Sequence, residues 1–232
     1  MNSNKPALRV IYGVVGLLSL IGVGIVVRRG LQLVSVLING YHPPATASSP
    51  TVAQLQQTEA LFAHYPVLTL IHILPGLLFI VLGPFQFSRR TRHRYPKWHR
   101  RSGRVVLLCG VIIGITGFIM SFAMPAIGGI NQAASTVLFS LFFLFALYKA
   151  YRHILRRNIA LHREWMLRAY AIGLAVAAIR PIVGIFYATS VFSGLTPYEF
   201  FGTAFWIGFV LHLMAAEAWI YHTRDKRVAG HA

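Results

Sequence analysis

The sequence predicts an all-α integral membrane protein, a single domain of six transmembrane helices over residues 1–232. Only 12% of the 232 residues are charged and 56% are hydrophobic, whereas soluble domains carry about 25% charged residues. Six apolar runs each approach the roughly 20 residues that a helix needs to cross the hydrocarbon core. The basic residues, which give a formal net charge of +17, lie mostly between these runs.

The expected spans cover residues 8–27, 67–87, 105–123, 134–151, 165–191 and 200–221. An extracytoplasmic loop is expected over residues 28–66, and residues 52–63 within it are rich in helix formers, which predicts a surface helix. The first span follows Lys5 and Arg9, as in a signal peptide. No small-residue cleavage site comes after it, so we interpret it as a retained span.

Basic residues gather in four segments: the start of the chain, residues 88–104, residues 149–168 and the tail. Six spans place all four on one side, and the positive-inside rule then predicts cytoplasmic termini, an N-in/C-in protein. A multi-pass location in a bacterial inner or plasma membrane is expected. The expected partner is the lipid bilayer, with anionic lipids on the cytoplasmic side. Nucleic-acid binding is not expected, and a homo-oligomer stays open.

Two polar residues stand within apolar runs near the outer third of the membrane. At about 1.5 Å of rise per residue, His72 and Arg180 both stand roughly 22 Å above the cytoplasmic ends of their spans. An arginine stays protonated and needs an anion, carbonyl groups or water. No Asp or Glu occurs at that depth, so the counter-charge is expected from a ligand: a propionate, a lipid phosphate or a quinone oxygen. The alternatives are a histidine bonded to a neighbouring helix and an arginine that extends to the headgroups.

His99 and His162 each open a basic stretch just before a span, and both are expected at the cytoplasmic interface. Two imidazoles at one level suit the iron of a haem, with nearby arginines such as Arg168 for its propionates. They also suit interfacial anchors beside tryptophans. His212, in the sixth span, is open to either interpretation, and Glu217 is expected to pair with a basic-loop arginine. The candidate haem-iron ligands are therefore His72, His99 and His162.

The order of several motifs resembles the bacterial predicted membrane proteins of the domain of unknown function 2306. The motifs are His72-x-x-Pro75-Gly76, Leu82-Gly83-Pro84-Phe85-Gln86-Phe87, His99-Arg100-Arg101-x-Gly103-Arg104, His162-Arg163-x-Trp165-Met166-x-Arg168-x-Tyr170 and Arg180-Pro181. The resemblance implies a helical membrane fold in which these residues belong together, but no activity. The architecture is also similar to cytochrome b561-type proteins. However, His212 is expected about 10 Å below His72, too deep to share one haem with it.

Three functions stay open. The first is a membrane redox protein that binds haem b or a quinone. The second is a transporter or binding protein for a small anion or lipid, with Arg180 and His72 as its site. The third is a structural membrane protein without a ligand. Enzymatic activity is undecided, since no P-loop, HExxH or Gly-rich dinucleotide motif is present. A cavity that contains both His72 and Arg180 would favour the first two functions over the third.

Overall fold

The computed structural model describes residues 5–42, 56 and 59–229, and within these residues it contains helices and no strands. The helices are α1 (Lys5–Asn39), α3 (Pro66–Phe87), α4 (Arg89–Arg94), α5 (Pro96–Ala123), α6 (Gly129–Leu155), α7 (Ile159–Ser193) and α8 (Pro197–Ala229). All of these except α4 are long and apolar enough to cross a membrane, which makes six candidate spans in the described part of the chain. The prediction of an all-α bundle with six spans is confirmed.

Most helices extend beyond the apolar runs that predicted them. Helix α1 continues through Arg28 and Arg29 to Asn39, so residues 28–39 are helical and are not part of a loop. Helix α5 begins at Pro96 and includes the basic residues before the apolar run. Arginine and lysine are good helix formers, and a helix loses nothing by extending into the headgroup region. Of the expected surface helix, residues 59–63 are helical, and most of the rest lies outside the described residues.

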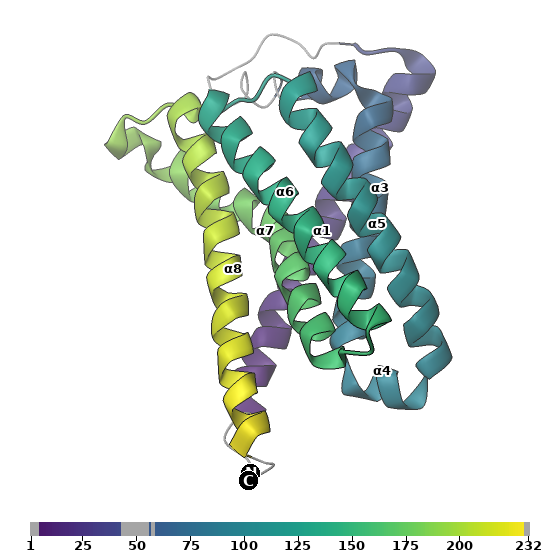
Figure 1. Cartoon of the computed structure of the whole chain (residues 1–232). Coiled ribbons are helices and arrows are strands. Elements are labelled where there is room, and N and C mark those ends of the chain that lie inside the picture. The colour runs from purple at the N-terminus through teal and green to yellow at the C-terminus, as the bar shows by residue number, and fades with distance from the viewer. Residues whose placement is uncertain (1–4, 43–55, 57–58, 230–232) are drawn as a thin grey trace.

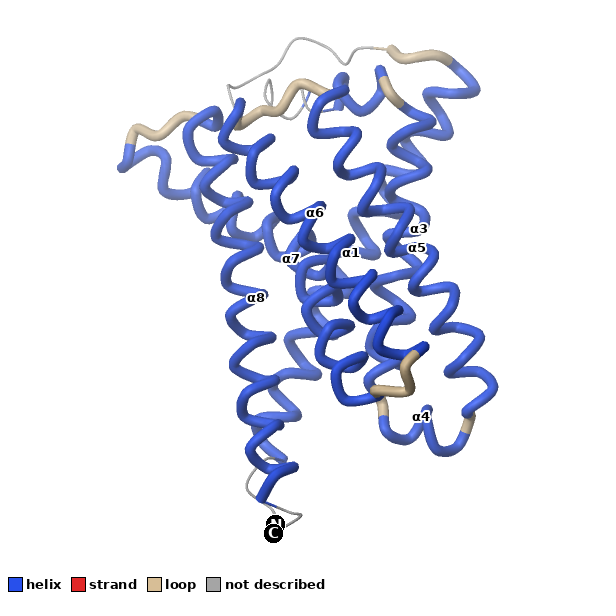
Figure 2. Tube along the Cα trace, viewed as in Figure 1, coloured by secondary structure: helices blue, strands red, loops and turns tan. Residues whose placement is uncertain are grey.

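The six long helices run side by side and alternate in direction (Figures 1 and 2). The start of α1, the end of α8 and the short basic helix α4 lie at one end of the bundle, at the bottom of Figure 1. We call this end, which includes Arg89–Arg94, the basic end, and we call the opposite end, where α1 leads towards α3, the loop end. That the basic end faces the cytoplasm remains a prediction from the positive-inside rule.

Helix α7 is the most enclosed span and packs against α1, α3, α6 and α8. The core around it depends on small residues that let bulky rings approach. Phe79 is 0% exposed, and a Cβ at Gly173 would lie 2.7 Å from its ring. A Cβ at Gly110 would lie 2.8 Å from Leu147. Close helix packing through glycine is typical of membrane interiors, where van der Waals contact drives association.

Candidate functional site

A cavity of about 320 Å³ lies among α1, α3, α5, α6, α7 and α8, and both His72 and Arg180 line it. Its walls are mainly aliphatic and aromatic. The side chains that can form hydrogen bonds on its wall are His72, Ser121, Gln132, Thr136, Ser140 and Arg180. The volume is at the lower end of the range of about 300–1,000 Å³ that is usual for ligand pockets. The two polar residues that stood out in the apolar runs therefore share one cavity.

The imidazole of His72 is held in one orientation by Thr116 of α5. Its Nδ1 lies 2.9 Å from the Thr116 hydroxyl oxygen, while that hydroxyl donates to the carbonyl oxygen of Ile112 at 2.7 Å. With the hydroxyl proton directed at Ile112, we assign Nδ1 as the donor to Thr116. In this tautomer the neutral ring carries a lone pair on Nε2, which can accept a hydrogen bond from a ligand in the cavity.

Arg180 follows a different pattern, because it forms no hydrogen bond or ion pair with any described residue. It belongs to α7, in the half of the bundle nearer the loop end, and more than a third of its surface is accessible where it lines the cavity. The next residue is Pro181, which has no N–H, so the carbonyl of Ala177 lacks its usual helical donor. Ala177 also lines the cavity. The five N–H donors of the Arg180 guanidinium, which no described residue accepts, and the freed carbonyl of Ala177 therefore belong to the same helix of the cavity wall.

The carboxylates whose side chains are described have partners elsewhere. Glu59 pairs with Arg28 at 3.0 Å, and Glu199 accepts from the backbone and hydroxyl of Thr196. Near the basic end, Glu164 pairs with Arg224 and Glu217 pairs with Arg168. The described part of the chain therefore supplies Arg180 with no counter-ion.

A second arginine lies near the loop end of the cavity, and the sequence reasoning missed it. Arg29 is 8% exposed, donates to Gln32 at 3.1 Å and lies 4.5 Å above the ring of Phe62, which lines the cavity. It is close enough to Arg180 for the two charges to repel each other. The missing signal was the continuation of α1 as a helix past residue 27. This continuation places Arg29 on the same face of α1 as Gly22 and Val26, which line the cavity.

His99 and His162 lie at the basic end, within electrostatic range of each other, and neither lines the cavity. The Nδ1 of His162 donates to the carbonyl oxygen of Ala150 at 2.9 Å. The Nδ1 of His99 is buried without a hydrogen-bond partner among the described residues. No group of three or more His, Cys, Asp or Glu side chains in the described chain could hold a metal ion. Haem ligation by these two histidines remains a prediction.

The other two candidates, Arg168 and His212, have partners outside the cavity. Arg168 binds Glu217 through two hydrogen bonds, one of them Nη2 to Oε2 at 2.8 Å, and its guanidinium lies 4.6 Å above the ring of Trp165. His212 donates from Nδ1 to the carbonyl oxygen of Gly208 at 2.8 Å, within its own helix. Arg168 therefore joins α7 to α8, and His212 does not meet His72 at the cavity.

Two further motif residues join helices near the basic end. The Gln86 amide donates to the Ser102 hydroxyl at 2.8 Å, and that hydroxyl donates to the carbonyl oxygen of Trp98 at 2.7 Å. A Cβ at Gly103 would lie 3.1 Å from Gln86 Oε1. These contacts fasten α3 to the start of α5, so this part of the family pattern has a packing role.

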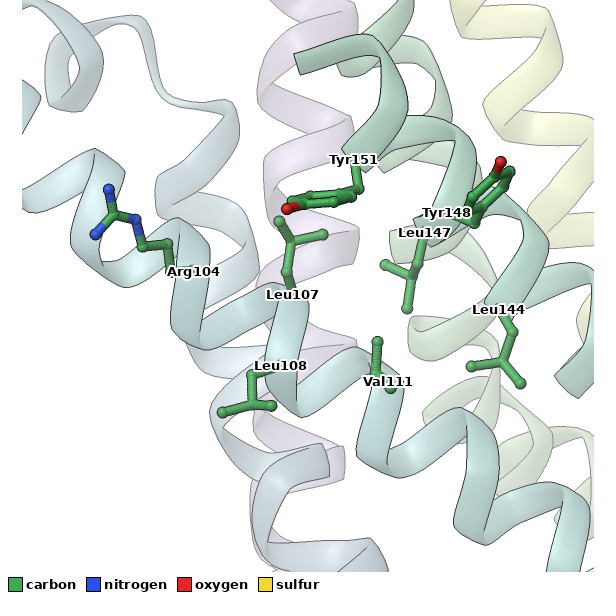
Figure 3. Close-up of a pocket in the computed structure, with 8 residues that line it drawn as sticks. All are labelled: Arg104, Leu107, Leu108, Val111, Leu144, Leu147, Tyr148 and Tyr151. Atoms are coloured by element: carbon green, nitrogen blue, oxygen red, sulfur yellow. The ribbon is translucent and has the colours of Figure 1, made fainter. Parts of the chain in front are cut away.

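A second hollow, of about 450 Å³, lies between α5 and α6 and has no histidine on its wall. Figure 3 shows leucine side chains and Val111 along it, with the Arg104 guanidinium directed away from them. Its position between only two helices and its apolar wall suit contact with an acyl chain of the surrounding bilayer.

The fold and the cavity define a polytopic membrane protein of six helices with an amphipathic internal site. The chain belongs to the family described as "Predicted membrane protein (DUF2306)", whose model matches residues 69–220. This region contains nearly all of α3, everything from α4 to α7 and α8 as far as residue 220, but not α1. No significant match to the chain was found among curated proteins or among solved structures.

Proposed function

We propose that this protein binds an amphipathic molecule with an anionic headgroup in the cavity, as a binding protein or transporter in the membrane. The observation that carries the proposal is Arg180, which lines the cavity without a counter-ion among the described residues. A fixed positive charge at membrane depth is expensive unless a partner neutralises it. An anionic ligand supplies that partner, because its charge-assisted hydrogen bonds would engage the guanidinium.

The cavity wall supports a hydrocarbon body for the same ligand. Phe79, Ile113 and Phe143 are typical of its surface, and polar side chains are few. Burial of apolar surface contributes about 25 cal/mol per Å², so an alkyl or isoprenoid chain would add affinity that a free inorganic anion lacks.

The alternative redox function receives less support from this geometry. His72 is the one imidazole on the cavity wall among the described residues, so haem bound there would lack a second histidine ligand. A quinone would accept hydrogen bonds from Arg180, but its neutral oxygens would leave the positive charge uncompensated. Haem b or quinone binding stays a prediction, and an absorption spectrum of the purified protein tests the haem version.

The direct test is the binding of a dansyl-labelled fatty acid to the full chain in phosphatidylcholine nanodiscs. We expect saturable binding to the wild type and a loss of at least about tenfold in affinity for Arg180→Gln, equivalent to about 1.4 kcal/mol. Arg180→Lys should retain part of the affinity, because it keeps the charge but loses the guanidinium fork.

Arg101→Gln is the matched control, because it removes one exposed arginine from α5 that lines neither the cavity nor the second hollow. It should bind the probe as the wild type does. Unchanged affinity in Arg180→Gln, with a folded protein by size-exclusion chromatography, would contradict the proposal.

A further inference from the structure

The wall that α1 contributes to the cavity continues towards the loop end as far as Arg29. Gly22, Ile25 and Val26 of α1 line the cavity. Residues three or four positions apart lie on the same face of a helix, so Arg29 is the next residue of this face. Its contact with Phe62, a residue of the cavity wall, agrees with this position.

Arg28 and Arg29 are adjacent on α1 near this end of the cavity, and the charges of both repel that of Arg180 on α7. Among the described residues, Glu59 is the carboxylate that contacts this cluster, and it is bound to Arg28. One carboxylate against three guanidiniums leaves an excess of two positive charges. Arg29 is buried, so water screens its positive charge poorly.

The chemistry of the headgroup follows from this excess charge. A fatty-acid carboxylate or a phosphodiester carries one negative charge and would compensate half of it. A phosphate monoester carries about −1.5 to −2 at pH 7 and offers three acceptor oxygens. Arginine binds phosphate through two parallel N–H groups, so two arginines from different helices can hold one such group.

We infer that the anionic ligand is a lipid phosphate monoester, with its phosphate between Arg29 and Arg180 and its hydrocarbon chain along the apolar wall of the cavity. This inference rests on the proposed function and adds the class of headgroup to it. The Nε2 of His72 is available on the same wall of the cavity to accept from a hydroxyl group of the ligand.

The inference is tested by competition against the labelled fatty acid in phosphatidylcholine nanodiscs. The competitors are dodecyl phosphate, dodecyl methyl phosphate, dodecanoate and inorganic phosphate. The first three share one chain and differ in headgroup charge, and the last has the headgroup without the chain. We expect dodecyl phosphate to bind at least about tenfold more tightly than each of the others.

Variants of Arg29 test whether this residue binds the phosphate headgroup. Arg29→Gln should reduce the advantage of dodecyl phosphate over dodecanoate to less than about threefold, while dodecanoate itself keeps most of its affinity through Arg180. Arg29→Lys keeps the charge and should retain most of the preference, which separates the effect of charge from a loss of folding. Arg101→Gln should leave the preference unchanged.

Any other result of the competition experiment would contradict either the headgroup class, the lipid nature of the ligand or the proposed function. Equal affinity for the three dodecyl compounds would reject the phosphate monoester but leave the proposed function intact. Inorganic phosphate that competes as well as dodecyl phosphate would reject a lipid and indicate a free ion. If no dodecyl compound competes and the labelled fatty acid does not bind, the proposed function fails and this inference fails with it.

Discussion

The hydroxyl of Tyr170 donates a hydrogen bond to the carbonyl oxygen of Ile80, at 3.2 Å, across the contact between α7 and α3. In an unbroken helix this carbonyl would accept from the N–H of residue 84, but residue 84 is proline and has none. Gly83 makes the approach possible, since a Cβ there would lie 2.0 Å from the Tyr170 ring. Gly83, Pro84 and Tyr170, which belong to two separate sequence motifs, therefore form one helix contact.

Tyr170→Phe should destabilise the protein by about 1–3 kcal/mol, because it leaves the buried Ile80 carbonyl without a donor. The same change should cost less in a Pro84→Ala background, where the backbone N–H of residue 84 can bond Ile80 again. Thermal unfolding in detergent of the wild type, both single variants and the double variant measures this coupling. Equal costs of Tyr170→Phe in the two backgrounds would show that Tyr170 does not compensate for Pro84.

Gly83→Ala should disrupt the α3–α7 contact, because the new methyl group would overlap the Tyr170 ring. Overpacking of this kind costs about 1–3 kcal/mol or more. Gly76→Ala on the same helix is the matched control, since its Cβ would lie 3.8 Å from the Ile113 side chain, an ordinary contact. The melting temperature should fall for Gly83→Ala alone. A similar fall in both variants would indicate a general intolerance of α3 to side chains.

The two ion pairs between α7 and α8 should contribute unequally to stability. Arg224 neutralises Glu164, whose side chain is 2% exposed, whereas Arg168 pairs with Glu217, whose side chain is 47% exposed. Arg224→Gln removes the charge opposite a buried carboxylate, so it should lower the free energy of unfolding more than Arg168→Gln does.

Arg168→Gln leaves a carboxylate that water and headgroups can solvate, and the ion pair that it removes should contribute about 1 kcal/mol or less. Unfolding of the two variants in one detergent gives the comparison. A larger loss for Arg168→Gln would refute this ranking, and would point to its contact with Trp165 as the dominant interaction.

The protonation of His72 can be observed directly. Nitrogen chemical shifts of the labelled ring should identify Nδ1–H as the dominant tautomer, because Thr116 accepts from Nδ1. Thr116→Val removes that acceptor and should produce a mixture of tautomers, while Thr116→Ser should preserve the wild-type spectrum. An Nε2–H tautomer in the wild type would contradict this assignment and remove the acceptor that the ligand model assigns to His72.

Arg180 should lower the stability of the empty protein, because its charge is unpaired among the described residues. Arg180→Met should therefore raise the free energy of unfolding without ligand, by about 1–4 kcal/mol if it behaves like other buried charges replaced by apolar side chains. Thermal unfolding after delipidation measures this change. A destabilised Arg180→Met would indicate that Arg180 has a structural partner and would weaken its role as a ligand site.

The number and order of the spans could be predicted from the sequence, because length and apolarity are what a bilayer requires. The ends of the helices could not. Hydropathy falls where the headgroups begin, but backbone hydrogen bonding continues past that point. Hydropathy therefore predicts a loop over residues 28–39, which are helical. This error concealed Arg29, whose place on the cavity face depends on the helical continuation of α1.

The site was partly predictable. Counting residues along two spans suggested that His72 and Arg180 lie at similar depth, and both do line one cavity. The resemblance indicated that the motif residues belong together, but it could not separate ligand groups from packing groups. The contact of Tyr170 with Ile80 and the pairing of Arg168 with Glu217 join residues far apart in the chain, so only the three-dimensional arrangement shows them.

Helix α1 lies outside the region that the family model matches, yet it contributes two of the three arginines at the loop end of the cavity. The helix contacts of Tyr170, Gln86 and Arg168, by contrast, lie within the matched region. Of the two arginines proposed to hold the headgroup, Arg180 lies inside the matched region and Arg29 lies outside it. Under the proposed function, exchange of α1 between relatives is expected to change the preferred headgroup, so the first helix is the place to look for divergence in ligand choice.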